Sequence, residues 1–244
     1  MENHALIDVQ GLVKRFGPKV VLRGLNFSVR PGEFVALLGS NGAGKTTFLR
    51  ILASLSSPSM GMVLVAGYAL PREAAAVRQR LGVVSHLPLL YGDLTAEENL
   101  RFFGKMYGVN PLESRIREVL RQVGLEKRAR DLVRTFSRGM QQRLAIGRAI
   151  LHDPDVLLLD EPHTGLDQDA CEMLDEILKE EARRGRTIVM TSHDLARVED
   201  LSSRFDVLSR GVICASIPKE SIPKDGLLAF YRNALGHHEG KGVE

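Results

Sequence analysis

A glycine-rich stretch that ends in a lysine and a threonine is the first candidate for chemistry in this chain. It fits GxxxxGK[ST] and consists of Gly39, Ser40, Asn41, Gly42, Ala43, Gly44, Lys45 and Thr46, with Thr47 counted as a further binding residue. Glycines let backbone N–H groups turn inward, and a helix start adds N–H groups and a positive dipole end, so the loop attracts phosphates. Lys45 can reach the outer phosphates, and the Thr46 hydroxyl can ligate Mg²⁺. The flanking strand-like and helical segments favour this interpretation over a glycine-rich turn with a chance lysine.

Two adjacent carboxylates supply a second candidate site. Asp160 and Glu161 follow the apolar run 156–159, which has the pattern of a fully buried strand. In an open parallel sheet, ligands bind at the carboxyl ends of the strands. Asp160 can hold Mg²⁺ through water, and Glu161 suits a base beside an attacking water. The alternative is an acidic helix cap after a core strand, which the nearby phosphate loop makes less attractive.

A histidine follows a second buried-strand pattern. His193 comes directly after "TIVMTS", so it is expected at the same sheet edge as Glu161. This position favours a contact to the γ-phosphate or to the attacking water. The alternative is a histidine with a purely structural hydrogen bond.

The order of the expected elements predicts an α/β fold with a parallel core sheet. Strand patterns cover 6–16, 20–29, 33–38, 61–67, 156–159 and 187–191, and helical patterns follow Thr46 and cover 95–123, 138–152 and 168–184. The early strands suggest an antiparallel β subdomain. The middle region, about 86–135, is expected to be a helical insertion with one apolar face formed by Leu100, Phe103, Met106 and Tyr107. We expect one domain over 1–217 and a tail over 218–244 that is partly helical or frayed.

Composition sets limits on the class of protein. Of the 244 residues, 44% are hydrophobic and 26% charged, which is typical of globular domains, and the net charge of +3 is too small to argue for nucleic acid. Cys171 and Cys214 lack metal-ligand spacing and are expected to be buried in a reducing compartment. The amino terminus lacks signal-peptide character, and no apolar run reaches the roughly 18 residues of a membrane span. A soluble protein is therefore expected, with any membrane span supplied by another chain.

Several further stretches resemble, in order, the ATP-binding subunit of ATP-binding-cassette transporters, a family of P-loop NTPases. "FSRGMQQR" (136–143) is similar to the family's signature, "HTGLD" (163–167) to its loop after the catalytic carboxylate, and "TSHD" (191–194) to its switch. Residues 84–100 resemble its glutamine-loop segment, and Phe16 occupies the place of the aromatic that stacks on adenine. The resemblance covers about residues 6–214 and implies an ATPase that binds ATP and Mg²⁺.

The resemblance also implies roles for the remaining site residues and a set of partner chains. ATP is expected between two copies, or between this chain and a second ATPase subunit, with Ser137, Arg138 and Gly139 acting on the partner's nucleotide. Asp167 is expected to help link the two sites, although it also fits a helix N-cap. A separate multi-span permease is expected to dock near Tyr91–Phe103, which places the chain at the cytoplasmic face of the cell membrane.

Three residues depart from the family pattern. His86 stands where glutamine is usual, and imidazole is a poor partner for Mg²⁺, so either His86 contacts water or the coupling is weaker. Arg138 replaces the first signature glycine, and Met140 replaces the signature glutamine. Lys45, Asp160 and Glu161 are unaffected, so hydrolysis is expected to persist.

The transported substrate is the least determined feature. The segments around 85–109 and 137–162 look most like haem-exporter cassettes, and drug, polysaccharide or lipid exporters look similar. A soluble ATPase acting on DNA or ribosomes is the rival class; the chain lacks the long coiled coil or second cassette of such relatives, and no nucleic-acid partner is expected.

Overall fold

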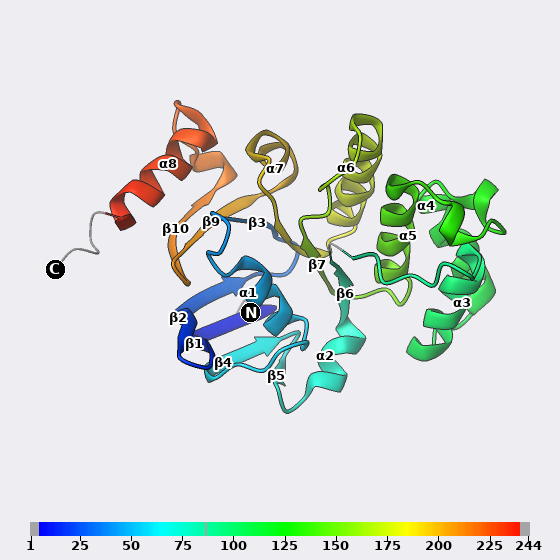
Figure 1. Cartoon of the computed structure of the whole chain (residues 1–244), viewed down its shortest axis with the longest axis horizontal. Coiled ribbons are helices and arrows are strands. Elements are labelled where there is room, and N and C mark those ends of the chain that lie inside the picture. The colour runs from blue at the N-terminus through cyan, green and yellow to red at the C-terminus, as the bar shows by residue number, and fades with distance from the viewer. Residues whose placement is uncertain (1–4, 86, 240–244) are drawn as a thin grey trace.

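The fold contains two β-sheets that meet around one helix. The computed structural model describes residues 5–85 and 87–239. The smaller, antiparallel sheet has the order β2 (Lys19–Val29), β1 (Ile7–Phe16), β4 (Met60–Val65) and β5 (Tyr68–Leu70). The larger sheet has the order β10 (Val212–Pro218), β9 (Arg204–Ser209), β3 (Phe34–Leu38), β8 (Thr187–Thr191), β7 (Val156–Asp160) and β6 (Leu81–Val84), and it is parallel except for the β9–β10 pair. Figure 1 shows the small sheet below one face of the large one, with α1 between them.

Helices cover the sheets and complete the chain. They are α1 (Lys45–Leu52), α2 (Ala74–Arg80), α3 (Ala96–Tyr107), α4 (Leu112–Gln122), α5 (Arg138–Ile150), α6 (Gln168–Arg183), α7 (Leu195–Leu201) and α8 (Gly226–Glu239). Helices α3 and α4 lie at one end of the molecule and α8 at the other (Figure 1). The expected α/β architecture, with an antiparallel subdomain and a helical insertion, is therefore confirmed.

The central strands are buried on both faces, as their continuous apolar pattern predicts. All five residues of β3 and of β7 are buried. Alternate side chains point to opposite faces of a strand, so Val35 and Leu37 join the core around α1, whereas Ala36 and Leu38 join the core around α5 and α6. The same sheet is thereby fixed from both sides, and its strand ends are held rigidly.

The helical insertion has the expected faces with one exception. In α4, Ile116, Val119 and Leu120 are buried. In α3, Leu100 is fully buried, but Met106 is 65% exposed, so its expected place on the same face is wrong. The physical reason is the helical period, because six residues at about 3.6 per turn leave Met106 on a different side of the helix from Leu100. Thr95 and Glu98 begin α3 with a reciprocal capping box.

The tail forms ordered structure over much of its length. Helix α8 packs against the core through buried Leu227 and partly buried Phe230, Tyr231 and Leu235. The short elements α2, β5, β9 and β10 and helix α7 are absent from the sequence-based expectations. Most of them are too short to show a clear apolar period, so their placement depends on the sheets that they join.

A half-buried histidine that follows α5 and contacts β6 predicts a pH-dependent stability. His152 Nε2 donates to Leu81 O (3.0 Å), and the ring stacks on Tyr107 with centroids 3.8 Å apart. Burial lowers the pKa of His152 to about 4 from the ordinary 6.5, although the hydrogen bond to Leu81 opposes this. The unfolded chain therefore takes up a proton before the folded one as pH falls. The stability that neutral His152 confers above about pH 6.5 is lost on approaching pH 4.

We expect this effect to be visible in urea titrations. The free energy of unfolding should fall by up to about 2 kcal/mol more in the wild type than in His152→Gln between about pH 7 and pH 5. Glutamine keeps a donor for Leu81 O but does not titrate. Equal pH dependence in the two proteins would show that His152 titrates normally in the fold.

Candidate nucleotide site

The glycine-rich loop follows β3 and leads into α1, and its conformation requires its glycines. Gly44 caps α1 with φ 112°, and Gly42 has φ 81°, both in the region that favours glycine. A Cβ on Gly39 would lie 2.4 Å from Leu208 O, so no larger residue fits against β9 there. The loop is therefore held open as a concave turn of backbone, with the amino terminus of α1 at its base.

Lys45 lies inside this turn. Its side chain is buried, and Nζ donates to Gly39 O (2.7 Å) and Ser40 O (3.3 Å). Burial lowers the pKa of Lys45, and the nearby Glu161 and Asp160 carboxylates oppose that shift. The ammonium group is thus fixed at the loop, where it can meet a phosphate at little cost in side-chain entropy.

Asp160 and Thr46 form a small cluster of oxygen ligands beside the loop. Thr46 Oγ1 donates to Asp160 Oδ1 (3.3 Å), and Thr191 Oγ1 donates to the same oxygen (2.8 Å). The register of β7 and β8 places Asp160 opposite Thr191. The described residues contain no group of three His, Cys, Asp or Glu side chains that could hold a metal. A hydroxyl and a carboxylate suit Mg²⁺, which takes oxygen ligands and usually completes its shell with water and substrate phosphates.

Glu161 and His193 meet at the ends of neighbouring strands. His193 Nε2 lies 2.5 Å from Glu161 Oε1. Glu161 has φ 52°, a strained value for a residue with a side chain, and its N–H donates to Thr191 Oγ1 (2.9 Å). Strain of this kind is stored where the surrounding structure enforces it, often at functional sites. Sequence reasoning did not identify Thr191, whose hydroxyl contacts both Asp160 and Glu161.

A cleft of ≈ 820 Å³ joins these elements. It is lined by the loop, by Glu161 and by residues of β1 and β2 that include Phe16. Phe16 is 53% exposed and lies under Lys14 Nζ, 4.8 Å from the ring centroid. The cleft therefore runs from the loop to an accessible aromatic ring.

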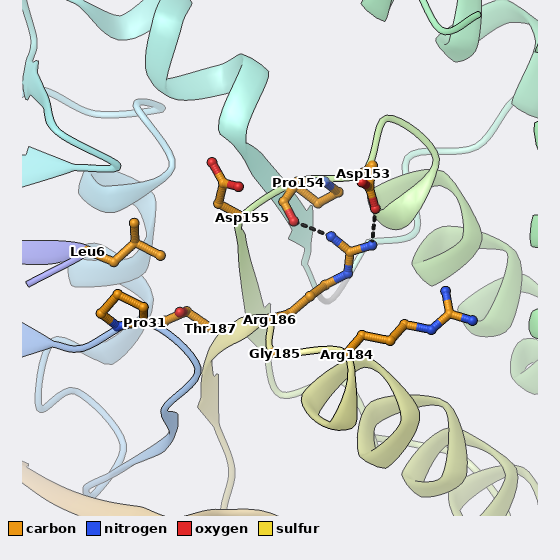
Figure 2. A pocket seen from close by; sticks show the side chains of 9 residues that line it. All are labelled: Leu6, Pro31, Asp153, Pro154, Asp155, Arg184, Gly185, Arg186 and Thr187. Atoms are coloured by element: carbon orange, nitrogen blue, oxygen red, sulfur yellow. Dashed lines mark hydrogen bonds and ion pairs between the residues drawn. The ribbon is translucent and has the colours of Figure 1, made fainter. Parts of the chain in front are cut away.

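A second cleft, of ≈ 380 Å³, lies at the opposite ends of the strands, beside the starts of β7 and β8 (Figure 2). Arg186 is the buried cation there, and its guanidinium is bound by Asp153, Glu181 and Pro154 O. Because its charge is paired within the chain, Arg186 is not free to bind a phosphate.

The signature-like segment begins α5 on another surface. Ser137 is the exposed N-cap, and its hydroxyl accepts from Met140 N (3.3 Å). Arg138 Nη2 donates to Thr164 O (2.9 Å), so its charge is anchored within its own chain. A Cβ on Gly139 would lie 2.8 Å from Ala170 Cβ, and glycine therefore lets α5 approach α6 closely.

Asp167 and the glutamine-loop segment complete the expected site residues. Asp167 is the exposed N-cap of α6 and accepts from Ala170 N (2.8 Å), which agrees with its alternative interpretation as a cap. His86 lies outside the described residues. The chain on either side of it is held by Arg148, which donates to Val83 O (3.0 Å) and Leu89 O (2.9 Å). Arg148 was missed, although a charge inside the apolar run "LAIGRAI" was a visible signal.

One protomer brings together only part of the expected set. The loop, Phe16 and Glu161 line one cleft, and Asp160 and His193 contact them directly. The described residues that line this cleft do not include Ser137, Arg138, Gly139 or Asp167. The signature-like segment therefore does not complete the site of its own chain.

A parallel sheet with a phosphate loop after β3 and carboxylates at the end of β7 defines a P-loop nucleotide hydrolase. Comparison with known proteins then gives the family: the model of the ABC transporter family matches residues 22–164, and the chain belongs to that family. It is an ATP-binding, ATP-hydrolysing subunit of an ABC transporter. No described helix combines the length and apolar character that crossing a membrane requires.

Curated relatives and solved structures agree with this assignment. The chain is 39% identical over 212 residues to the linearmycin resistance ATP-binding protein LnrL of Bacillus subtilis (strain 168), covering 86% of this chain and 68% of the relative. It is 42% identical over 209 residues to the Nod factor export ATP-binding protein I of Burkholderia lata, covering 85% and 69%. These relatives give no support to the haem-exporter resemblance.

Two solved structures share the fold over almost their whole length. An ATP-binding subunit of an ABC transporter has a TM-score of 0.86 at 32% identity and covers 94% of this chain and 99% of its own. A dimeric ATP-binding cassette in a post-hydrolysis state, bound to ADP and Pi, has a TM-score of 0.79 at 26% identity and covers 87% and 98%. The dimer agrees with the expectation that two copies work together.

Proposed function

We propose that this chain energises an exporter by hydrolysing ATP between two cassettes, with Glu161 as the base. The contact between Glu161 and His193, beside the loop and Asp160, is the single observation that carries the proposal. The names of the relatives, which concern linearmycin resistance and Nod factor export, favour a drug or polysaccharide exporter over a haem exporter.

Each residue of the cleft has a role that its position supports. The loop amides and Lys45 bind and orient the phosphates. Thr46 and Asp160 would hold Mg²⁺, which when bound would neutralise charge on the phosphate oxygens. Glu161 positions a water and accepts its proton, while His193 holds the Glu161 carboxylate in place. Phe16 offers a ring on which the adenine stacks.

The second cassette completes the site. Ser137 is exposed at the amino terminus of α5, where the N–H groups and helix dipole favour an anion. Because Ser137 does not line the cleft of its own chain, we assign it to the nucleotide of a partner cassette, as the family resemblance implies. Asp167, exposed at the start of α6, is placed at the same junction.

Mixed dimers test this exchange directly. Glu161→Gln removes the base, and Ser137→Arg blocks the signature surface, so each protein alone should be inactive. Mixing them should restore about a quarter of the wild-type rate, since random pairing gives mixed dimers with one intact site each. Mixing Glu161→Gln with Lys45→Ala serves as control, because both changes affect the same half of a site. No recovery in the first mixture would show that each chain works alone.

An aromatic patch formed by Tyr91, Phe102 and Phe103 supports docking of a membrane-spanning partner. Tyr91 and Phe102 are 50% and 41% exposed, with ring centroids 5.1 Å apart. Buried Asn99 fixes the preceding loop by accepting from Tyr91 N (2.8 Å) and donating to Tyr91 O (3.0 Å). Exposed aromatic groups on a rigid support are typical of interaction sites. We therefore place the permease here and the chain at the cytoplasmic face of the membrane.

Substituting the centre of the aromatic patch should release the permease. We expect Phe102→Ser to weaken binding by about 2 kcal/mol, without loss of ATP binding. The measurement is co-purification in detergent with the multi-span membrane protein that is tested as the permease. Met173→Ser, which changes an exposed apolar residue on α6, is the matched control. Equal recovery of the permease with both variants would place the docking surface elsewhere.

A further inference from the structure

A largely buried polar cluster lies behind the proposed catalytic pair. It consists of His163, Asp175 and Arg197, whose side chains are only 9%, 14% and 14% exposed. His163 Nε2 lies 2.7 Å from Asp175 Oδ1, and Arg197 Nη1 donates to Asp175 Oδ2. The three residues come from three elements: the loop after β7, helix α6 and helix α7. Asp175 is the shared acceptor, so it ties the other two elements together.

The two elements that Asp175 joins are the ones that carry the catalytic pair. His163 follows Glu161 by two residues, and α7 begins directly after the His193–Asp194 segment. Asp194 caps α7 by accepting from Arg197 N (3.1 Å), so Arg197 is attached to the histidine loop through backbone as well. A cleft of ≈ 310 Å³ is lined by Glu161, His163, His193 and Arg197 together. A shift of either element would therefore change the contact between Glu161 and His193.

We propose that Asp175 is a positioning residue for ATP hydrolysis, holding the Glu161 loop and the His193 loop in the register that brings the two side chains together. The inference rests on the proposed function, because it assigns Asp175 an effect only through Glu161 and His193. It adds a support from helix α6, a part of the chain far along the sequence from the phosphate loop and from the aromatic patch.

The chemistry of a carboxylate explains why this position requires aspartate. An ionised carboxylate only accepts hydrogen bonds and can serve two donors at once, here the His163 Nε2–H and the Arg197 guanidinium. Asparagine has the same shape but offers one accepting oxygen and an NH₂ group. In Asp175→Asn, Arg197 loses the carboxylate charge with which it forms an ion pair, and His163 Nε2 faces an NH₂ group unless its proton moves to Nδ1. A largely buried network of this kind loses its fixed geometry when one partner of a charge pair is removed.

Steady-state kinetics of the full chain tests the proposal. Asp175→Asn should lower kcat by about tenfold or more, as expected when catalytic groups are misplaced by a fraction of an ångström to an ångström. KM for ATP should stay within about twofold, because the phosphate loop is untouched. Glu176→Gln is the matched control: the adjacent residue on α6 is exposed and pairs with Lys179 (2.9 Å) at the surface. An unchanged kcat for Asp175→Asn would overturn the proposal.

A double-mutant cycle separates positioning from general destabilisation. In a His193→Ala background, Asp175→Asn should have little further effect on kcat, because the contact that it positions is already lost. If the losses of kcat in the two single variants multiply in the double variant, Asp175 has a purely structural role. Thermal unfolding shows whether Asp175→Asn folds. If it does not, the same cycle is measured with Arg197→Gln and with His163→Asn. Full activity of both variants would overturn the proposal. Full activity of His193→Ala alone would instead contradict the proposed function.

Discussion

ATP turnover by Glu161→Gln should fall by roughly 10²–10³-fold, the loss expected when a general base is removed, while ATP remains bound. Glutamine keeps the shape of the side chain and can still contact His193, but it cannot accept the proton of the attacking water. Lys45, Thr46 and Asp160, which face the phosphates in the proposed site, are unchanged. Binding and chemistry should therefore separate in this variant.

The same variant should accumulate closed dimers in ATP and Mg²⁺. Each γ-phosphate would retain its charge-assisted hydrogen bonds to both cassettes, and without hydrolysis these bonds persist. Size-exclusion chromatography with light scattering measures the dimer, and phosphate release measures turnover. Glu180→Gln, which affects a surface pair with Arg183 at the far end of α6, is the control. Monomers under saturating ATP, or turnover at the wild-type rate, would refute the assignment of Glu161.

The Lys45→Ala protein should lose nucleotide affinity by on the order of 10²-fold, the value of one or two hydrogen bonds from a charged donor. The ammonium group is buried in the concave turn, where its hydrogen bonds to Gly39 O and Ser40 O already fix its position. Alanine leaves the backbone amides in place but removes the only charge that the loop itself carries.

Isothermal titration with ATP and Mg²⁺ measures this loss. Lys105→Ala, an exposed lysine on α3, serves as the control for a change of net charge. Thermal unfolding of both variants shows whether the loop region remains folded. Unchanged affinity in Lys45→Ala would remove this lysine from the proposed site and leave the loop amides as the sole phosphate ligands.

The phosphate loop, the carboxylates and the histidine could be located from the sequence because each is a local feature. The glycine pattern needs only the strand before it and the helix after it, and Asp160 and Glu161 follow an apolar run that can be buried only inside a sheet. Equivalent ends of parallel strands meet at one edge, and for this reason the sequence alone predicts that His193 lies near Glu161.

Contacts between distant segments could not be derived in this way. Sequence periodicity does not connect the elements that these contacts join. Arg138 donates to Thr164, and Arg148 supports the segment that resembles a glutamine loop. The Thr191 hydroxyl likewise lies beside Asp160. Met106 is a different case, because the helical period itself places it about a third of a turn from Leu100, and its assignment to the same face misapplied that period. Short elements such as α2 and β5 carry too few residues for a period to appear.

Thus the chain by itself indicated the family, the glycine-rich loop and the residues proposed for chemistry, since these depend on neighbouring residues and on the burial of apolar runs. The tertiary structure alone decided which parts touch. The strand order places β3 between β9 and β8, and the packing of α6 against the loop after β7 and against α7 brings His163, Asp175 and Arg197 into one largely buried cluster. Hydrogen bonds and charge pairing act over a few ångströms in space, so chain folding, and not sequence separation, selects the partners.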